Sequence, residues 1–121
     1  MELYEYQNEA MKTCTESSRN VTYMLLNLVS EVGEFSEKIA KAVRKEQITI
    51  QDDQIGCVST SDIDFDRFLG ECKKEAGDIL WQLSGLCEVF GWTLEEVAEE
   101  NLAKLRDRLS RGVIVGSGDN R

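Results

Sequence analysis

Residues 25–43 read LLNLVSEVGEFSEKIAKAV, and this stretch decides the fold class. Apolar side chains recur in it at steps of three and four, which is the period of an α-helix rather than of a β-strand. We therefore expect one amphipathic helix over about residues 21–45. Its apolar positions are Leu25, Leu28, Val29, Val32, Phe35, Ile39 and Val43.

Similar patterns on both sides of this stretch predict three further helices. They are a first helix over about residues 2–18, a third from Phe65 that ends at Gly91, and a fourth that Thr93 begins as N-cap and that runs to about Leu109. Proline is absent from the 121 residues, which favours long uninterrupted helices. The sequence thus predicts an all-α protein, a four- to five-helix bundle that forms one domain over residues 1–121.

Two segments interrupt the helical pattern. Residues 46–63 are polar and lack the period of three and four, so we expect a long connector between the second and third helices, with a short strand-like turn at Ile48 to Ile50. Residues 110–121 are rich in glycine, and we expect a tail or loop there.

The composition excludes several classes of protein. The chain has 14 lysines and arginines against 23 aspartates and glutamates, a formal net charge of −9, so the phosphates of nucleic acids repel it. It contains no histidine, which excludes Ser-His-Asp and Cys-His nucleophile systems, His-ligated zinc and Glu-x-x-His di-iron centres. Any chemistry must therefore rely on carboxylates, lysines, arginines or thiols.

The cysteines and the apolar runs bear on where the protein works. Cys14, Cys57, Cys72 and Cys87 form no C-x-x-C pair, which predicts reduced thiols in a cytoplasmic protein. The first residues lack the apolar stretch of a signal peptide, and no apolar run is long enough to cross a bilayer. We therefore expect no membrane partner.

Two acidic pairs carry the strongest functional signal. Glu31 and Glu34 lie three residues apart on the second expected helix, as do Glu75 and Asp78 on the third, so each pair shares one side of its helix. Both pairs flank the apolar stripe on the same side, and antiparallel packing brings such flanks together. Four clustered carboxylates repel one another, and an oxygen-only ligand set without imidazole selects Mg²⁺, or Mn²⁺ in its place. Each pair alone is also typical of a solvated helix face.

The fourth expected helix carries cationic residues beside its apolar side. Asn101, Lys104 and Arg108 lie along one flank, where an anionic ligand would suit them; the alternative is ordinary surface charge paired with Glu100 and its neighbours. Lys38 either pairs with a carboxylate one turn away or contacts a phosphate. The positions expected to face the core are Leu94, Ala98, Leu102, Leu105 and Leu109.

Three motifs in this order resemble the MazG-like all-α nucleoside triphosphate pyrophosphohydrolases, whose signature is E-x-x-E followed by E-x-x-D. They are LVSEVGE at 28–34, EAGDILW at 75–81 and NLAKLRDR at 101–108. The resemblance runs from about Tyr6 to the end of the chain, and GSGDNR at 116–121 is similar to the tail of one subgroup.

The resemblance implies Mg²⁺-dependent hydrolysis of nucleoside triphosphates between the α and β phosphates, giving the monophosphate and pyrophosphate. It implies that four acidic residues hold the metal, and we expect Glu34 to assist in removing a proton from the attacking water. It also implies nucleotide contacts by Asn101 and Lys104. The metal ligands are Glu31, Glu34, Glu75 and Asp78, and the expected substrate contacts are Lys38, Asn101, Lys104, Arg108 and Arg121.

The sequence leaves alternatives for the oligomeric state, for the role of the connector and for the surroundings of Trp81. Family members form dimers or tetramers in which neighbouring subunits complete the site, so we expect a homodimer or homotetramer. The 40 residues between Glu34 and Glu75 exceed the usual interval, so residues 46–63 are a lid, a specificity element or an oligomer contact. Trp81 faces a subunit interface, which we favour, or a nucleobase or water.

Two other functions fit the same pattern. One is a non-catalytic helical interaction module whose acidic strips are only solvated. The other is a related enzyme that hydrolyses the same bond in a phosphoribosyl-nucleotide.

Overall fold

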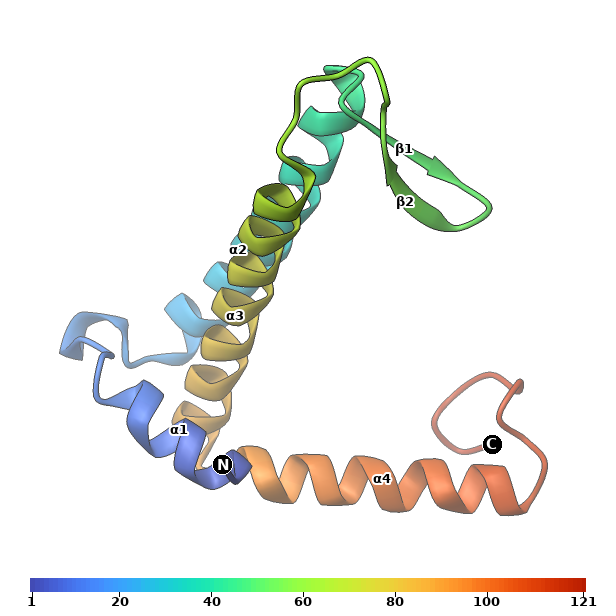
Figure 1. Ribbon diagram of the computed structural model, residues 1–121. Helices are drawn as coiled ribbons and strands as arrows, with labels where there is room; N and C mark the ends of the chain where they lie inside the picture. The colour runs from blue at the N-terminus through green and yellow to red at the C-terminus, as the bar shows by residue number, and fades with distance from the viewer.

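A computed structural model describes residues 1–121 (Figure 1). It is mostly helical, with one two-stranded antiparallel sheet, and the predicted all-α class is confirmed. No helix has the length and apolar character that crossing a membrane requires. The elements are α1 (Leu3–Met11), a 3₁₀ turn η1 (Glu16–Ser18), α2 (Val21–Arg44), β1 (Ile48–Gln51), β2 (Gln54–Cys57), α3 (Phe65–Phe90) and α4 (Leu94–Ser110).

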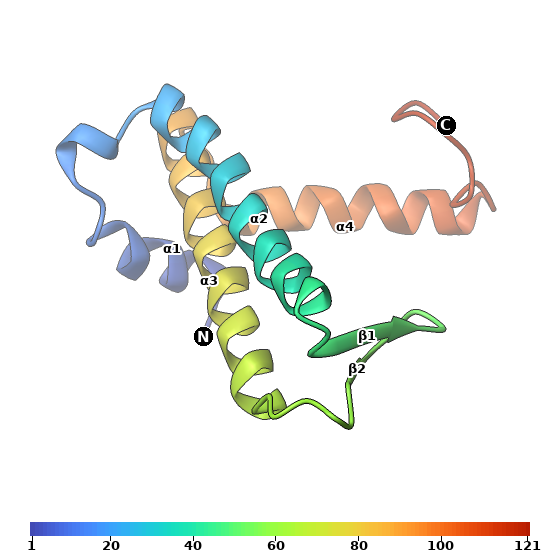
Figure 2. The same ribbon diagram turned by 90° about the horizontal axis from the view of Figure 1, so that it is seen from above.

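Helices α2 and α3 form a long antiparallel pair, as predicted (Figures 1 and 2). Near the start of α2, Met24 is fully buried, and it packs so tightly on Gly85 that a methyl group there would collide with its sulfur and terminal carbon. At the far end of the pair, a small apolar core forms around Ala42 and Phe68. The two ends fix how far one helix can slide along the other.

Local signals set the helix boundaries. The side chain of Asn20 accepts a hydrogen bond from the backbone N–H of Tyr23 at the start of α2, a typical N-cap. Gly91 ends α3 with φ of 76°, in the left-handed region that favours glycine. Thr93 then caps α4 by accepting from the N–H of Glu96 at 3.0 Å. The predicted end at Gly91 and start at Thr93 are confirmed.

The predicted first helix over residues 2–18 is wrong in its second half, because α1 ends at Met11. Hydroxyl groups beyond that point bond locally instead of continuing the helix: Thr13 donates to the carbonyl of Ala10, and Thr15 shares a hydrogen bond with Ser18. A separate 3₁₀ turn follows before α2 begins.

The connector contains a β-hairpin, which extends the predicted strand-like turn at Ile48 to Ile50. Ile48 pairs with Cys57 and Ile50 with Ile55, and Asp52 and Asp53 turn the chain with φ of 51° and 59°. Two consecutive left-handed residues are typical of a tight hairpin turn that matches the strand twist. Ile48 is buried in the core at the end of α2, whereas the tip of the hairpin projects from it (Figure 2).

Helix α4 extends away from the α2–α3 pair (Figures 1 and 2). Gln7 of α1 holds the first turn of α4 in place. The Gln7 side chain accepts a hydrogen bond from the N–H of Leu94 at 2.7 Å and donates one to the carbonyl of Trp92. Beyond this corner the expected core side of α4 does not face a core. Leu94 is buried, but Leu102 is 48% exposed and Leu109 71% exposed, because no other element of the chain covers them.

Candidate functional site

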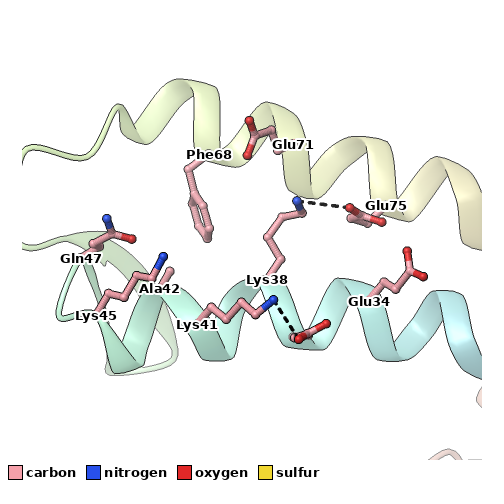
Figure 3. A pocket seen from close by; sticks show the side chains of 10 residues that line it. Glu34, Lys38, Lys41, Ala42, Lys45, Gln47, Phe68, Glu71 and Glu75 are labelled. Carbon is pink, nitrogen blue, oxygen red and sulfur yellow. Dashed lines mark ion pairs between the residues drawn. The ribbon is translucent and has the colours of Figure 1, made fainter.

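Three acidic side chains meet where α2 crosses α3. One carboxylate oxygen each from Glu31, Glu34 and Glu75 lies within 4.8 Å of the others. The antiparallel packing supplies the match in height that the sequence could not show. Figure 3 shows Glu34 of α2 facing Glu75 of α3 at one end of a groove between the two helices.

The electrostatics of Glu31 reflect this crowding. Partial burial raises its pKa above the usual glutamate range, and the negative charge of Glu34 raises the pKa further. The charges of Asp78 and Glu75 act in the same direction, more weakly. A proton or a cation is therefore favoured at this point of the seam.

A chain of amide hydrogen bonds holds Glu31 in place. Gln82 is 1% exposed, and it donates to the carbonyl of Met24 and accepts from the amide of Asn27 at 2.8 Å. The same Asn27 amide donates to the carboxylate of Glu31 at 3.0 Å, which lowers the pKa of Glu31 and partly offsets the effect of burial. Groups of this kind orient a metal ligand and tune its affinity.

Asp78, the fourth expected ligand, does not lie in the group of three carboxylates. Burial raises the pKa of Tyr6 on α1, and the negative charge of Asp78 raises the pKa of that phenol further. The charge of Asp78 also raises the pKa of Glu31, so Asp78 lies close to the cluster without belonging to it.

Lys38 bridges the two helices. Its ammonium group lies 3.3 Å from the carboxylate of Glu75, and both side chains are less than one-third exposed. The pairing within one helix, one of the two alternatives for Lys38, is thus replaced by a pairing across the seam, and the phosphate contact stays a prediction. Lys38 is therefore a cation already placed at the edge of the acidic cluster.

A polar groove of about 400 Å³ opens from the cluster and runs between α2 and α3 toward the hairpin (Figure 3). Glu34 and Glu75 line its inner end, and Lys41 and Lys45 continue the line of Lys38 along α2. Lys41 and Lys45 are not among the predicted binding residues. Their spacing of three and seven residues from Lys38 places all three on one helical face and is visible in the sequence.

The cationic residues of α4 lie apart from this site. Asn101 and Lys104 line a second groove of about 470 Å³ beside the ring of Trp92. Arg108 is 5% exposed and donates to the Asp119 carboxylate at 3.2 Å, and Lys104 lies 3.6 Å from the same group. Their partner is thus the tail rather than Glu100.

Arg121 closes the tail into a loop. Its guanidinium donates to the carbonyls of Val113, Ile114 and Gly118. Arg121 is therefore placed with α4 and the tail, and not with the three carboxylates.

Trp81 was expected to face a subunit interface, but its indole N–H contacts α1 of the same chain. The indole N–H donates to the Ala10 carbonyl at 3.1 Å and to the Thr13 hydroxyl at 2.8 Å. Trp81 thus holds the end of α1 against α3. The sequence places Trp81 opposite the apolar centre of α3, and α1 packs on that side.

The three-carboxylate group has the chemistry of a hard-cation site. Its donors are all oxygens, they come from two rigid helices, and their mutual repulsion favours a positive ion. The chain is thus an α-helical protein with a potential divalent-cation site at a helix seam, beside a groove lined by lysines.

Comparison with known proteins identifies its family. The model of the MazG nucleotide pyrophosphohydrolase domain matches residues 19–112, so the chain belongs to this family, as its motifs indicate. It is also 33% identical over 106 residues to the Gene 37 protein of Mycobacterium phage L5, an alignment that covers 88% of this chain and 81% of the phage protein. No solved structure matches.

Proposed function

We propose that this protein hydrolyses nucleoside or deoxynucleoside triphosphates between the α and β phosphates, in a reaction that requires Mg²⁺, and serves nucleotide-pool housekeeping. The observation that carries the proposal is the meeting of Glu31, Glu34 and Glu75 at the α2–α3 seam of a MazG-family chain. Mn²⁺ is the expected substitute, since it accepts the same oxygen ligands.

The chain's own residues then have distinct roles. Glu31, Glu34, Glu75 and the adjacent Asp78 would hold the metal, which supplies Lewis acidity and neutralises charge on the phosphates. Glu34 is exposed enough to accept a proton from the attacking water. The water oxygen forms a new bond to phosphorus while the bond to the bridging oxygen breaks, and pyrophosphate leaves with that electron pair.

We also propose that the enzyme is a homodimer or homotetramer. One chain exposes 8699 Å², whereas a compact monomer of this mass exposes about 6,600 Å². This excess is larger than the roughly 800 Å² that each partner buries in a standard interface. It includes apolar residues of α2 and α4, such as Val29 and Leu109, which are 69% and 71% exposed.

Assembly also offers a route to a complete site. Asn101, Lys104 and Trp92 form a groove with an aromatic face, an amide and a cation, which suits a nucleotide but lies apart from the carboxylates of the same chain. A second copy that covers the exposed face of α2 with its α4 would bring such a groove to the metal cluster. The four free cysteines and this substrate class fit the cytoplasmic location that we propose.

The test is the release of pyrophosphate and monophosphate from a panel of nucleoside and deoxynucleoside triphosphates with Mg²⁺. We expect activity on at least one, with losses of at least about 100-fold in Glu34→Gln and Asp78→Asn and none in Glu99→Gln, an exposed control on α4. Inactivity across the panel together with turnover of a phosphoribosyl-nucleotide would identify the related enzyme instead. Inactivity on both, without Mg²⁺ binding, would favour an interaction module.

A further inference from the structure

The groove between α2 and α3 is continuous with the metal cluster. Glu34 and Glu75 belong to both, so a ligand at the carboxylates lies at the inner end of the groove, beside the Lys38–Glu75 pair (Figure 3). Only two lining residues are apolar, Ala42 and Phe68, and both are buried in its floor. A floor this small with polar walls suits a charged, hydrophilic group rather than a nucleobase.

Three ammonium groups line the α2 side of this groove. Lys38, Lys41 and Lys45 are spaced by three and four residues, so they stand about 4.5 and 6 Å apart along the helix axis. Lys38 lies at the inner end against Glu75, and Lys45 lies at the outer end, near Gln47. The line of cations leads away from the acidic cluster.

The acidic residues of the groove pair with only part of this line: Lys38 contacts Glu75 across the seam at 3.3 Å. Lys41 pairs with Glu37 at 2.9 Å, but both side chains are more than half exposed, and such pairs contribute little. Glu71, on the α3 side, pairs with Arg67 at 3.4 Å. No acidic residue lies within salt-bridge distance of Lys45.

The turn after α2 closes the outer end of the groove. Gln47 donates its N–H to the Ala42 carbonyl and Glu46 to the Val43 carbonyl, with Glu46 at φ of 56°. These are the two hydrogen bonds of a Schellman motif, which ends the helix and turns the chain. The groove thus has a floor, two helical walls and an end of fixed structure.

We propose that this groove binds the terminal diphosphate of the substrate, and hence the pyrophosphate product, through Lys41 and Lys45 together with Lys38. The proposal rests on the proposed function for the identity of the substrate. It gives the substrate a direction: the β and γ phosphates point toward the hairpin, and the nucleoside points toward α1. Lysine is a common phosphate ligand, acting as a point charge.

The experiment measures inhibition by pyrophosphate and by the nucleoside monophosphate product in wild type, Lys41→Gln, Lys45→Gln and the double variant. We expect each single variant to weaken pyrophosphate inhibition about fivefold, and the double variant about 25-fold if the two contacts are independent. Inhibition by the monophosphate should not change. Lys73→Gln, an exposed lysine on α3 outside the groove, is the matched control.

Three results would overturn the proposal: unchanged pyrophosphate inhibition in the double variant, equal weakening by Lys73→Gln, or equal weakening for the monophosphate. Lysines in the last turns of α2 also interact favourably with the helix dipole. Losing only that interaction would lower the melting temperature of the variants without a selective effect on pyrophosphate inhibition.

Calorimetric measurement of Mg²⁺-pyrophosphate binding distinguishes failure of this proposal from failure of the proposed function. If the protein is inactive but binds pyrophosphate through Lys41 and Lys45, the proposed reaction is wrong and the role of the groove stands. If the enzyme is active but its pyrophosphate binding does not depend on either lysine, the reaction stands and the role of the groove is wrong.

Discussion

The amide of Asn27 lies 3.0 Å from the carboxylate of Glu31, one turn along α2, and the same nitrogen lies 2.8 Å from the buried Gln82 on α3. One side chain thus connects the packing of the two helices to the orientation of Glu31, a proposed metal ligand. Asn27 is not part of the E-x-x-E motif, and only the structure shows its role.

Replacement of Asn27 by Leu should weaken Mg²⁺ binding about 10- to 100-fold, the usual cost of losing a group that orients a ligand. Mg²⁺ that binds the folded protein should raise the melting temperature of wild type by linkage, and the variant should need correspondingly more Mg²⁺ for the same rise. The titration of melting temperature with Mg²⁺ measures this. Asn8→Leu on α1 is the control, and equal effects of both substitutions would contradict the role of Asn27.

Replacing Gly85 or Gly70 by alanine, both on α3, should have opposite effects on the stability of the protein. Gly85→Ala should destabilise the protein by about 1–3 kcal/mol, because the added methyl collides with Met24. Gly70→Ala meets no neighbour, so it should stabilise the protein by roughly 0.5–1 kcal/mol through the lower entropy of the unfolded chain. Urea denaturation measures both free energies of unfolding. Similar changes in the two variants would contradict the close packing at Gly85.

The exposed apolar positions should control assembly. Val29→Glu and Leu109→Glu should each shift the protein to monomers, since a charge buried in an interface costs several kcal/mol. Val115→Glu is the control, because Val115 is 98% exposed in the tail. Sedimentation velocity measures the mass, and circular dichroism checks the fold. Retention of the wild-type mass in both variants, or a monomeric wild type, would refute assembly through these faces.

The side-chain carboxylate of Asp119, in the tail, should have a pKa below the usual aspartate range. The hydrogen bond from Arg108 lowers the pKa of Asp119 first, and the positive charge of Lys104 adds to the effect. The contact therefore stabilises the fold above the usual aspartate pKa and is lost as pH falls through the lower folded value. Carbon-detected NMR titration should show this pKa rising in Arg108→Gln. A normal pKa in wild type would show that the tail does not hold this contact in solution.

Much of the helical framework follows from local sequence. The period of three and four predicted α2 and α3, and Gly91 and Thr93 marked the corner between α3 and α4 correctly, because caps depend on a few adjacent residues. The first helix was predicted too long, since the hydroxyl side chains after Met11 compete with the helix for hydrogen bonds.

The apolar stripe of α2 was less informative about packing. Val29 and Val32 belong to the stripe but are 69% and 46% exposed, whereas Glu31 and Lys38 lie in the seam with α3. Periodicity shows which residues share a face, but it does not show whether the neighbour is another helix of the chain or a second subunit.

By itself, the sequence determined the helices, their caps, the two acidic pairs and the family to which they belong, because these depend on spacing along the chain. Only the tertiary structure decided that Glu31, Glu34 and Glu75 meet while Asp78 stays beside them, that Asn27 and Gln82 support the group, and that Lys104 and Arg108 bind Asp119. These relationships depend on the register of α2 against α3 and on the direction of α4. Contacts such as Met24 on Gly85 and Gln7 on Leu94 set both, and they join residues that are far apart in the sequence.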